Sequence, residues 1–129
     1  MNASSKNDTN AENGEHMVDL TPIALLETIR SHGRVWGELA AQYGVTNPDP
    51  PWKVNLEATC DALSAEACAL PLLERRSEED ELSASLYSNV PFPERQLLAL
   101  AHSMIKRGLV DEKELASRMK QVHDRLTSA

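Results

Sequence analysis

The side chains of this 129-residue chain that are best suited to polar chemistry are two adjacent arginines, Arg75 and Arg76, which precede a block of acidic residues. A guanidinium group is planar and can donate two parallel hydrogen bonds, so the pair could bind an oxyanion on another chain. The same arginines could instead neutralise the neighbouring acids in exposed ion pairs, each worth about 0–1 kcal/mol. The residues alone favour the ion pairs and leave both interpretations open.

No familiar catalytic or metal-binding motif accompanies the arginines. The sequence lacks a glycine-rich phosphate loop, a His-Glu-x-x-His pair and a nucleophile elbow. The histidines are scattered, and only His102 and His123 fall in neighbouring predicted helices. An antiparallel pairing of those helices separates the two rings by about two turns. We therefore expect both to be surface or interface histidines, and we expect no metal site in this chain.

Cys60 and Cys68 are the only cysteines, and they lie eight residues apart on one predicted helix. At about 1.5 Å per residue the helix separates them by about 12 Å, which is too far for a disulfide or for one shared metal ion. The sequence therefore predicts two small, partly buried thiols in a reducing compartment.

Three aromatic residues, Trp52, Tyr87 and Phe92, stand near predicted helix starts and turns. Aromatic rings often supply much of the binding energy at protein interfaces, so the three form a candidate surface for binding a partner. Rings at such positions also fill hydrophobic cores, and core packing is the more frequent use. Both interpretations stay open.

The elements that must position these residues are helices. The strongest pattern runs from Pro91 to Leu126, where one amphipathic helix stops at Gly108 and a second begins at Asp111, whose carboxylate is placed to cap it. The spacing predicts a helical hairpin with one apolar side. Its expected buried residues are Leu97, Leu100, Ala101, Met104 and Ile105 in the first helix and Leu115, Met119, Val122 and Leu126 in the second. Alternating strand patterns are nearly absent, so the sequence predicts an all-α fold, a small helical domain.

Upstream of the hairpin the chain divides by composition. Residues 1–17 are almost wholly polar, which predicts a disordered amino-terminal tail. Residues 18–50 predict a helical arm, in which Thr21 caps the first helix, followed by a proline-rich linker. Residues 51–129 predict the main helical domain. Within it, the charged block 74–81 is expected to face water or a charged partner.

Composition narrows the class of protein. Asp and Glu total 20 against 13 Lys and Arg, and the basic residues are interleaved with acids, so we expect no nucleic-acid binding. No apolar run approaches the roughly 20 residues that cross a bilayer, and no signal peptide opens the chain. We therefore expect a cytoplasmic protein that does not associate with a membrane.

Several short segments between Pro51 and Leu126 occur in a recognisable order. They are Pro51-Trp52, Ala58-Thr59-Cys60, Glu74-Arg75-Arg76, Val90-Pro91-Phe92 with Arg95, Leu97 and Leu98, and Gly108-Leu109-Val110 with Glu114-Leu115. Together they resemble the amino-terminal helical domain of the nitrile hydratase β subunit family. The likeness is closest to the β subunit of thiocyanate hydrolase, in which this domain is a separate polypeptide.

The resemblance implies a function that depends on other chains. Enzymes of this family hold cobalt(III) or iron(III) in a partner subunit, through a Cys-x-x-Cys-x-Cys loop with partly oxidised thiolates, and add water to a nitrile or a thiocyanate. This chain lacks that loop and lacks the β-barrel of a full-length β subunit. It is therefore expected to be a β-type subunit that is not catalytic alone and binds no cofactor itself. Its expected partners are a metal-bearing α-type subunit and a separate small β-barrel subunit.

The resemblance also implies a role for the arginine pair. In the family, arginines of the β subunit reach the oxygens of the oxidised cysteine ligands, and Arg75 and Arg76 fall in the matching region. Such contacts orient the ligands and tune the metal. Two other functions stay open, namely an accessory activator that delivers the metal to such an enzyme and a helical adaptor with no link to metal catalysis. Activators tend to carry a carboxy-terminal extension, whereas this sequence stops directly after its last predicted helix, which favours a permanent subunit.

Overall fold

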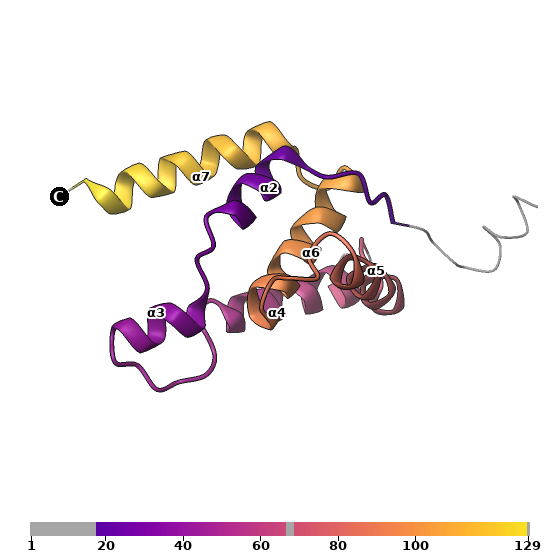
Figure 1. The fold of residues 1–129 in the computed structure, drawn as a ribbon. Coiled ribbons are helices and arrows are strands. Elements are labelled where there is room, and N and C mark those ends of the chain that lie inside the picture. Colours follow the sequence, from indigo (N-terminus) through magenta and orange to yellow (C-terminus); the bar gives the residue numbers. More distant parts are fainter. Residues whose placement is uncertain (1–17, 67–68, 129) are drawn as a thin grey trace, which may run out of the picture.

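The structure is a computed structural model that describes residues 18–66 and 69–128, and every regular element in those ranges is helical (Figure 1). The elements are α2 (Ala24–Ser31), α3 (Trp36–Gln42), α4 (Lys53–Asp61), a π-helical segment (Ala62–Glu66), α5 (Leu72–Ala84), α6 (Phe92–Lys106) and α7 (Glu112–Thr127). The all-α prediction is therefore confirmed. The predicted tail, residues 1–17, and Cys68 lie outside the described residues.

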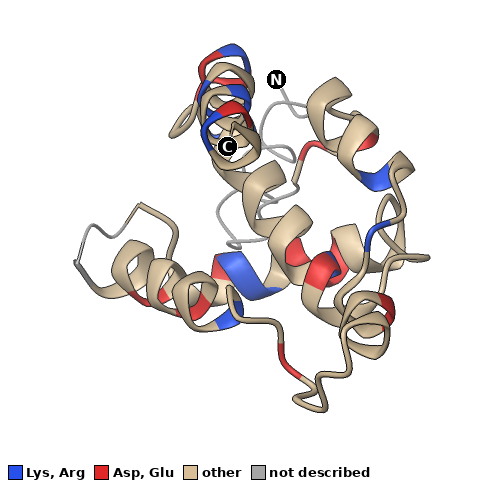
Figure 2. Ribbon diagram, turned by 90° about the vertical axis from the view of Figure 1, so that its left-hand side faces the viewer, with Lys and Arg blue, Asp and Glu red and all other residues tan. Residues whose placement is uncertain are grey.

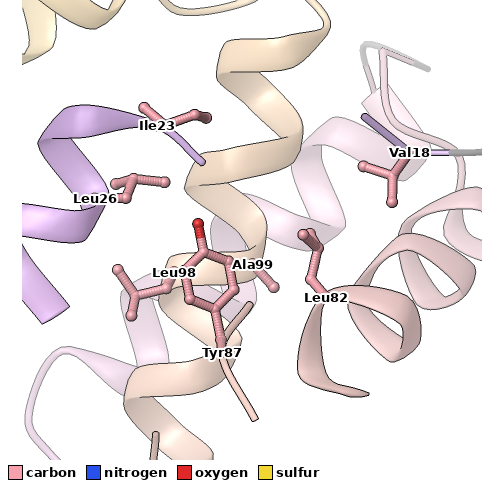
Figure 3. Close-up of a cluster of buried hydrophobic side chains, with 7 residues drawn as sticks. All are labelled: Val18, Ile23, Leu26, Leu82, Tyr87, Leu98 and Ala99. Atoms are coloured by element: carbon pink, nitrogen blue, oxygen red, sulfur yellow. The ribbon is translucent and has the colours of Figure 1, made fainter. Parts of the chain in front are cut away.

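Helix α6 lies at the centre of the fold and is buried on two sides. On one side a hydrophobic cluster joins the amino-terminal arm, α5 and α6, and its side chains point toward one another in Figure 3. The members of this cluster are Val18, Ile23, Leu26, Leu82, Tyr87, Leu98 and Ala99. On the other side Leu100 packs with Leu56 and Cys60 of α4 and with Leu70. The predicted buried face of α6 was too narrow, because it included Leu100 but not Leu98 or Ala99.

The amino-terminal arm belongs to the same hydrophobic core as the rest of the chain. Ile23 and Leu26 are buried against α5 and α6, so the division at residue 50 is not a boundary of the core. The predicted cap at Thr21 is wrong, because α2 begins at Ala24. The Thr21 N–H instead donates to Asp19 Oδ1 at 2.9 Å.

The connection between α6 and α7 forms as the sequence predicts. Gly108 has φ of +76°, in the left-handed region that glycine adopts without a steric penalty. The Gly108 N–H donates to the Ile105 carbonyl and the Leu109 N–H to the Met104 carbonyl, which is the hydrogen-bond pattern of a Schellman motif. Asp111 then caps α7, because its Oδ2 accepts from the Glu114 N–H at 2.9 Å.

The sequence predicted a helical hairpin in which α7 packs against α6, but α7 does not fold back onto α6. It runs away from the end of α6, and the Leu25 N–H of α2 donates to Glu112 Oε2 in its first turn (Figure 1). No residue of α7 is buried. Of the four residues predicted to be buried, Leu115 is half-buried, whereas Met119, Val122 and Leu126 are 39%, 42% and 75% exposed. The burial prediction failed because an apolar stripe identifies the face of a helix that is suited to packing, but it does not identify the element that packs on that face.

Candidate functional site

Arg75 and Arg76 lie in the first half of α5, ahead of most of its acidic residues. Arg75 is 13% exposed, and its Nη1 lies 3.6 Å from Glu79 Oε1 one turn further on. Arg76 is exposed and forms no ion pair with the residues that the structure describes. The two arginines, Glu79 and Gln96 line one hollow of about 380 Å³. Arg75 thus forms an ion pair with Glu79, one of the neighbouring acids, whereas the guanidinium of Arg76 is accessible.

The hollow beside the arginines mixes both signs of charge. Burial raises the pKa of Glu79, and the neighbouring Arg75 opposes that rise. Two buried polar atoms, Arg75 Nε and Gln96 Oε1, have no hydrogen-bond partner among the described residues. Of the pair, Arg76 is therefore the residue whose position fits contact with an oxyanion on another chain, while Arg75 helps to hold the wall of the hollow.

The charged block 74–81 was expected to face water or a charged partner, but one of its residues is buried within the chain. Glu78 is 1% exposed, and its Oε2 accepts from Arg107 Nη2 at 2.6 Å. The same Nη2 donates to Glu74 Oε1 at 2.7 Å, so Arg107, at the end of α6, joins two turns of α5. The sequence analysis missed this network. A usable signal was present, because Glu78 lies four residues before the buried Leu82 and therefore on the same face of α5.

Tyr87 is fully buried in the core, so it is not on a surface where a partner could bind. Its hydroxyl lies 2.9 Å from His102 Nδ1, and the two rings meet edge to face. The reason for the burial is that the turn after α5 carries Tyr87 between α2 and α6 (Figure 3). For Tyr87 the core interpretation is the correct one.

His102 is buried as well, whereas the sequence placed it on the surface. Its Nε2 lies 2.7 Å from the Asp19 carbonyl, so the neutral ring donates there and accepts from the Tyr87 hydroxyl through Nδ1. Burial lowers the pKa of His102. His123 on α7 is exposed, as predicted. The two histidines thus occupy opposite environments.

Trp52 and Phe92 remain candidates for partner binding. Phe92 is 51% exposed, and Lys53 Nζ lies 6.0 Å from the centre of its ring, within the range of a cation–π contact. Trp52 is half-buried and lines an apolar groove between α4 and α6.

That apolar groove has a volume of about 350 Å³ and ends where α7 begins. Its floor comes from Leu56, Leu100 and Met104, and its far end from Val110 and Leu115. Leu115 is also the first residue of the apolar stripe on α7. The groove and the stripe therefore form one continuous apolar surface, which we call the α7 surface and which consists of the groove together with Met119, Val122 and Leu126.

Within residues 18–66 and 69–128, no three His, Cys, Asp or Glu side chains come together as a metal site requires. Cys60 is buried, and that burial raises the pKa of its thiol. Acidic and basic positions are interspersed on α7 (Figure 2). None of the described helices is both long enough and apolar enough to span a membrane.

Comparison of the chain with protein-family models, with curated proteins and with solved structures gives no match. The resemblance to nitrile hydratase β subunits therefore rests on the residues alone and stays a prediction.

Proposed function

We propose that this chain is a β-type helical subunit of a heteromeric metalloenzyme of the nitrile hydratase or thiocyanate hydrolase kind, acting in the cytoplasm. The observation that carries the docking role is the apolar stripe of the α7 surface, in which the described residues leave Met119, Val122 and Leu126 39%, 42% and 75% exposed. An uncovered stripe of this kind marks a site of protein association. The family itself is supported by the order of the segments between Pro51 and Leu126.

The proposed partners are an α-type subunit with a Cys-x-x-Cys-x-Cys loop and a small β-barrel subunit. Arg118 and Arg125 lie seven residues apart along one edge of the stripe. Arg118 already pairs with Glu114 at 3.6 Å, so Arg125 is the residue of that edge that an acidic group of the partner should meet.

Within the assembly the metal of the partner would activate a nitrile or thiocyanate toward water. This chain would contribute the Arg76 guanidinium, which is accessible and unpaired among the described residues, as a donor to the oxidised cysteine oxygens. Arg75 would support that side of α5 through its contact with Glu79. Phe92 and Trp52 would line the docking surface at the opposite end of the groove from α7.

The first experiment tests docking by co-expressing the chain with an α-type subunit that carries the cysteine loop. Met119→Glu combined with Val122→Glu places two charges on the stripe and should abolish co-purification. Ser117→Glu combined with Gln121→Glu adds the same charge on the other face of α7 and should leave co-purification intact. Failure of the unmodified chain to co-purify contradicts the proposal, and equal behaviour of the two double variants contradicts the α7 surface as the docking site.

The second experiment tests the arginines in the assembled enzyme. Arg76→Lys keeps the charge but loses the two-pronged donor, so turnover should fall by about tenfold or more while assembly is unchanged. Arg75→Lys should have a smaller effect on turnover. Unchanged turnover for both variants would support a plain adaptor instead. A chain that is needed only while the metal is loaded, and is absent from the active complex, would be an activator.

A further inference from the structure

A second cavity lies between the α2–α3 arm and the start of α6, and it shares Trp52 and Leu97 with the groove of the α7 surface. Its volume is about 570 Å³. Pockets that bind small molecules typically measure about 300–1,000 Å³ and are lined mainly by apolar and aromatic side chains with a few polar groups. The size of this cavity therefore suits a small organic molecule.

The cavity exists because hydrogen bonds hold the arm at a distance from α6. Gly33, with φ of +65°, ends α2 and redirects the chain toward α3. The Trp36 N–H then donates to Glu94 Oε2 at 2.6 Å, which joins the start of α3 to the first turn of α6. The Trp36 Nε1 donates to the Asn47 carbonyl at 3.0 Å and fixes the indole. The walls are thus fixed by contacts between residues far apart in the sequence.

Most of the cavity wall is apolar. Ile29 of α2, Leu39 of α3, and Val90 and Leu98 at the start of α6 line it, together with the ring of Trp52. A flat hydrocarbon or aromatic body placed between these side chains would leave water and gain contact with an indole face.

The polar part of the lining is balanced in charge, with two arginines and two glutamates. Arg34 is exposed and has no ion-pair partner within the described ranges. Arg30 pairs with Glu27 through Nη2, while its buried Nε has no hydrogen-bond partner in the same part of the chain. Two acids also line the cavity. Glu94 already accepts a backbone hydrogen bond, and the exposed Glu38 is screened by water.

We infer that this cavity binds a small organic carboxylate with an apolar, aromatic body. The carboxylate pairs with the Arg34 guanidinium, and the body packs between Leu39, Val90 and the Trp52 ring. The inference does not depend on any metal, and only the Trp52 ring, at the start of α4, also belongs to the surface proposed for docking.

The chain carries its own reporters for this binding. Its only two tryptophans, Trp36 and Trp52, both line the cavity, so a ligand that enters it changes the fluorescence of every tryptophan present. Titration of the full chain with 3-phenylpropionate should give a saturable change. The matched neutral amide, 3-phenylpropionamide, should bind about five- to tenfold more weakly, the effect of losing one charge-assisted hydrogen bond.

Variants locate the binding. Arg34→Gln should remove the preference for the acid over the amide, whereas Arg118→Gln, on α7, should leave it unchanged. Val90→Phe fills the cavity and should weaken both ligands, with circular dichroism confirming that the helices are retained. Equal affinity for acid and amide, or an unchanged preference in Arg34→Gln, overturns the inference. The absence of saturable binding at millimolar ligand also overturns the inference. If both tryptophans then become shielded only when a partner protein binds, the cavity belongs to a protein interface.

Discussion

Helices α6 and α7 follow one another along the chain and carry the same kinds of residue in opposite surroundings. Leu98, Arg107 and His102 belong to α6 or its end and contact other helices, whereas Leu126, Arg118 and His123 of α7 are exposed. Both helices are amphipathic, yet α6 is covered on two sides and α7 buries no residue. The comparison teaches that α6 is specified by contacts within the chain. The apolar side of α7 is left largely exposed by the residues that the structure describes.

The leucine pair gives the largest expected difference. Leu98→Ala leaves a cavity in the cluster between α2, α5 and α6 and should lower the free energy of unfolding by about 2–4 kcal/mol. Leu126→Ala removes the same atoms from a side chain that is 75% exposed, so its effect should stay within about 0.5 kcal/mol. Urea unfolding followed by circular dichroism measures both. Comparable losses in the two variants would show that α7 packs in solution.

The arginine pair gives the next largest difference. Arg107→Met removes the cation that pairs with the buried Glu78 carboxylate and should cost about 2–3 kcal/mol, since Arg107 itself is partly exposed. Arg118→Met breaks a 3.6 Å pair with Glu114 in which both side chains are more than half exposed, and should cost less than about 0.5 kcal/mol.

A second substitution separates lost charge pairing from lost packing in this network. Glu78→Gln added to Arg107→Met removes the buried carboxylate charge that Arg107 neutralises in the unmodified chain, and it should restore part of the stability. If the double variant is as unstable as the sum of the singles, the ion pair is not the cause.

The difference between the two helices also explains which features could be predicted from the sequence. Helix ends were predictable where they depend on local residues, as at Gly108 and Asp111, because glycine stops and side-chain caps act within a few positions. The partners of buried polar residues were not predictable, although the place of Glu78 on the face of Leu82 indicates its burial. Glu78 is buried because Arg107 lies 29 residues away in sequence, and His102 because the Asp19 carbonyl lies 83 residues away.

The candidate site shows the same limit. The sequence singled out Arg75 and Arg76 by residue type, but it did not show that their environments differ. Adjacent residues of a helix point in different directions, so Arg75 contacts Glu79 whereas Arg76 is exposed. The cavity beside Trp36 and Trp52 was not predictable either. It depends on the contact between Trp36 and Glu94, 58 residues apart.

The histidine pair predicts a difference in pH dependence. Burial lowers the pKa of His102 in the folded chain below its ordinary value of about 6.5, so the folded state binds fewer protons than the unfolded state just below that pH. The stabilising contribution is complete above about pH 6.5 and is lost as the pH falls toward the folded pKa. The free energy of unfolding should therefore decline as the pH falls below about 6.5. His102→Gln should flatten that decline, and His123→Gln should follow the unmodified chain. Identical slopes in all three proteins would exclude His102 as the cause.

The smallest effect should come from the cap of α7 and tests whether that helix is an independent unit. Asp111→Ala removes the hydrogen bond to the Glu114 N–H, worth about 1 kcal/mol to the helix that it caps. Because α7 buries no residue, that loss should appear as faster amide exchange along 112–127 and leave the urea midpoint of the remaining helices nearly unchanged. Asp124→Ala, a substitution near the other end of α7 that removes only an exposed contact with Lys120, provides the control and should change exchange little. A fall in the urea midpoint of the whole chain with Asp111→Ala would mean that α7 is coupled to the core. In that case α6 and α7 would differ only in how strongly each is coupled to the core. An effect confined to α7 would mean that its stability is set locally until a partner covers the stripe.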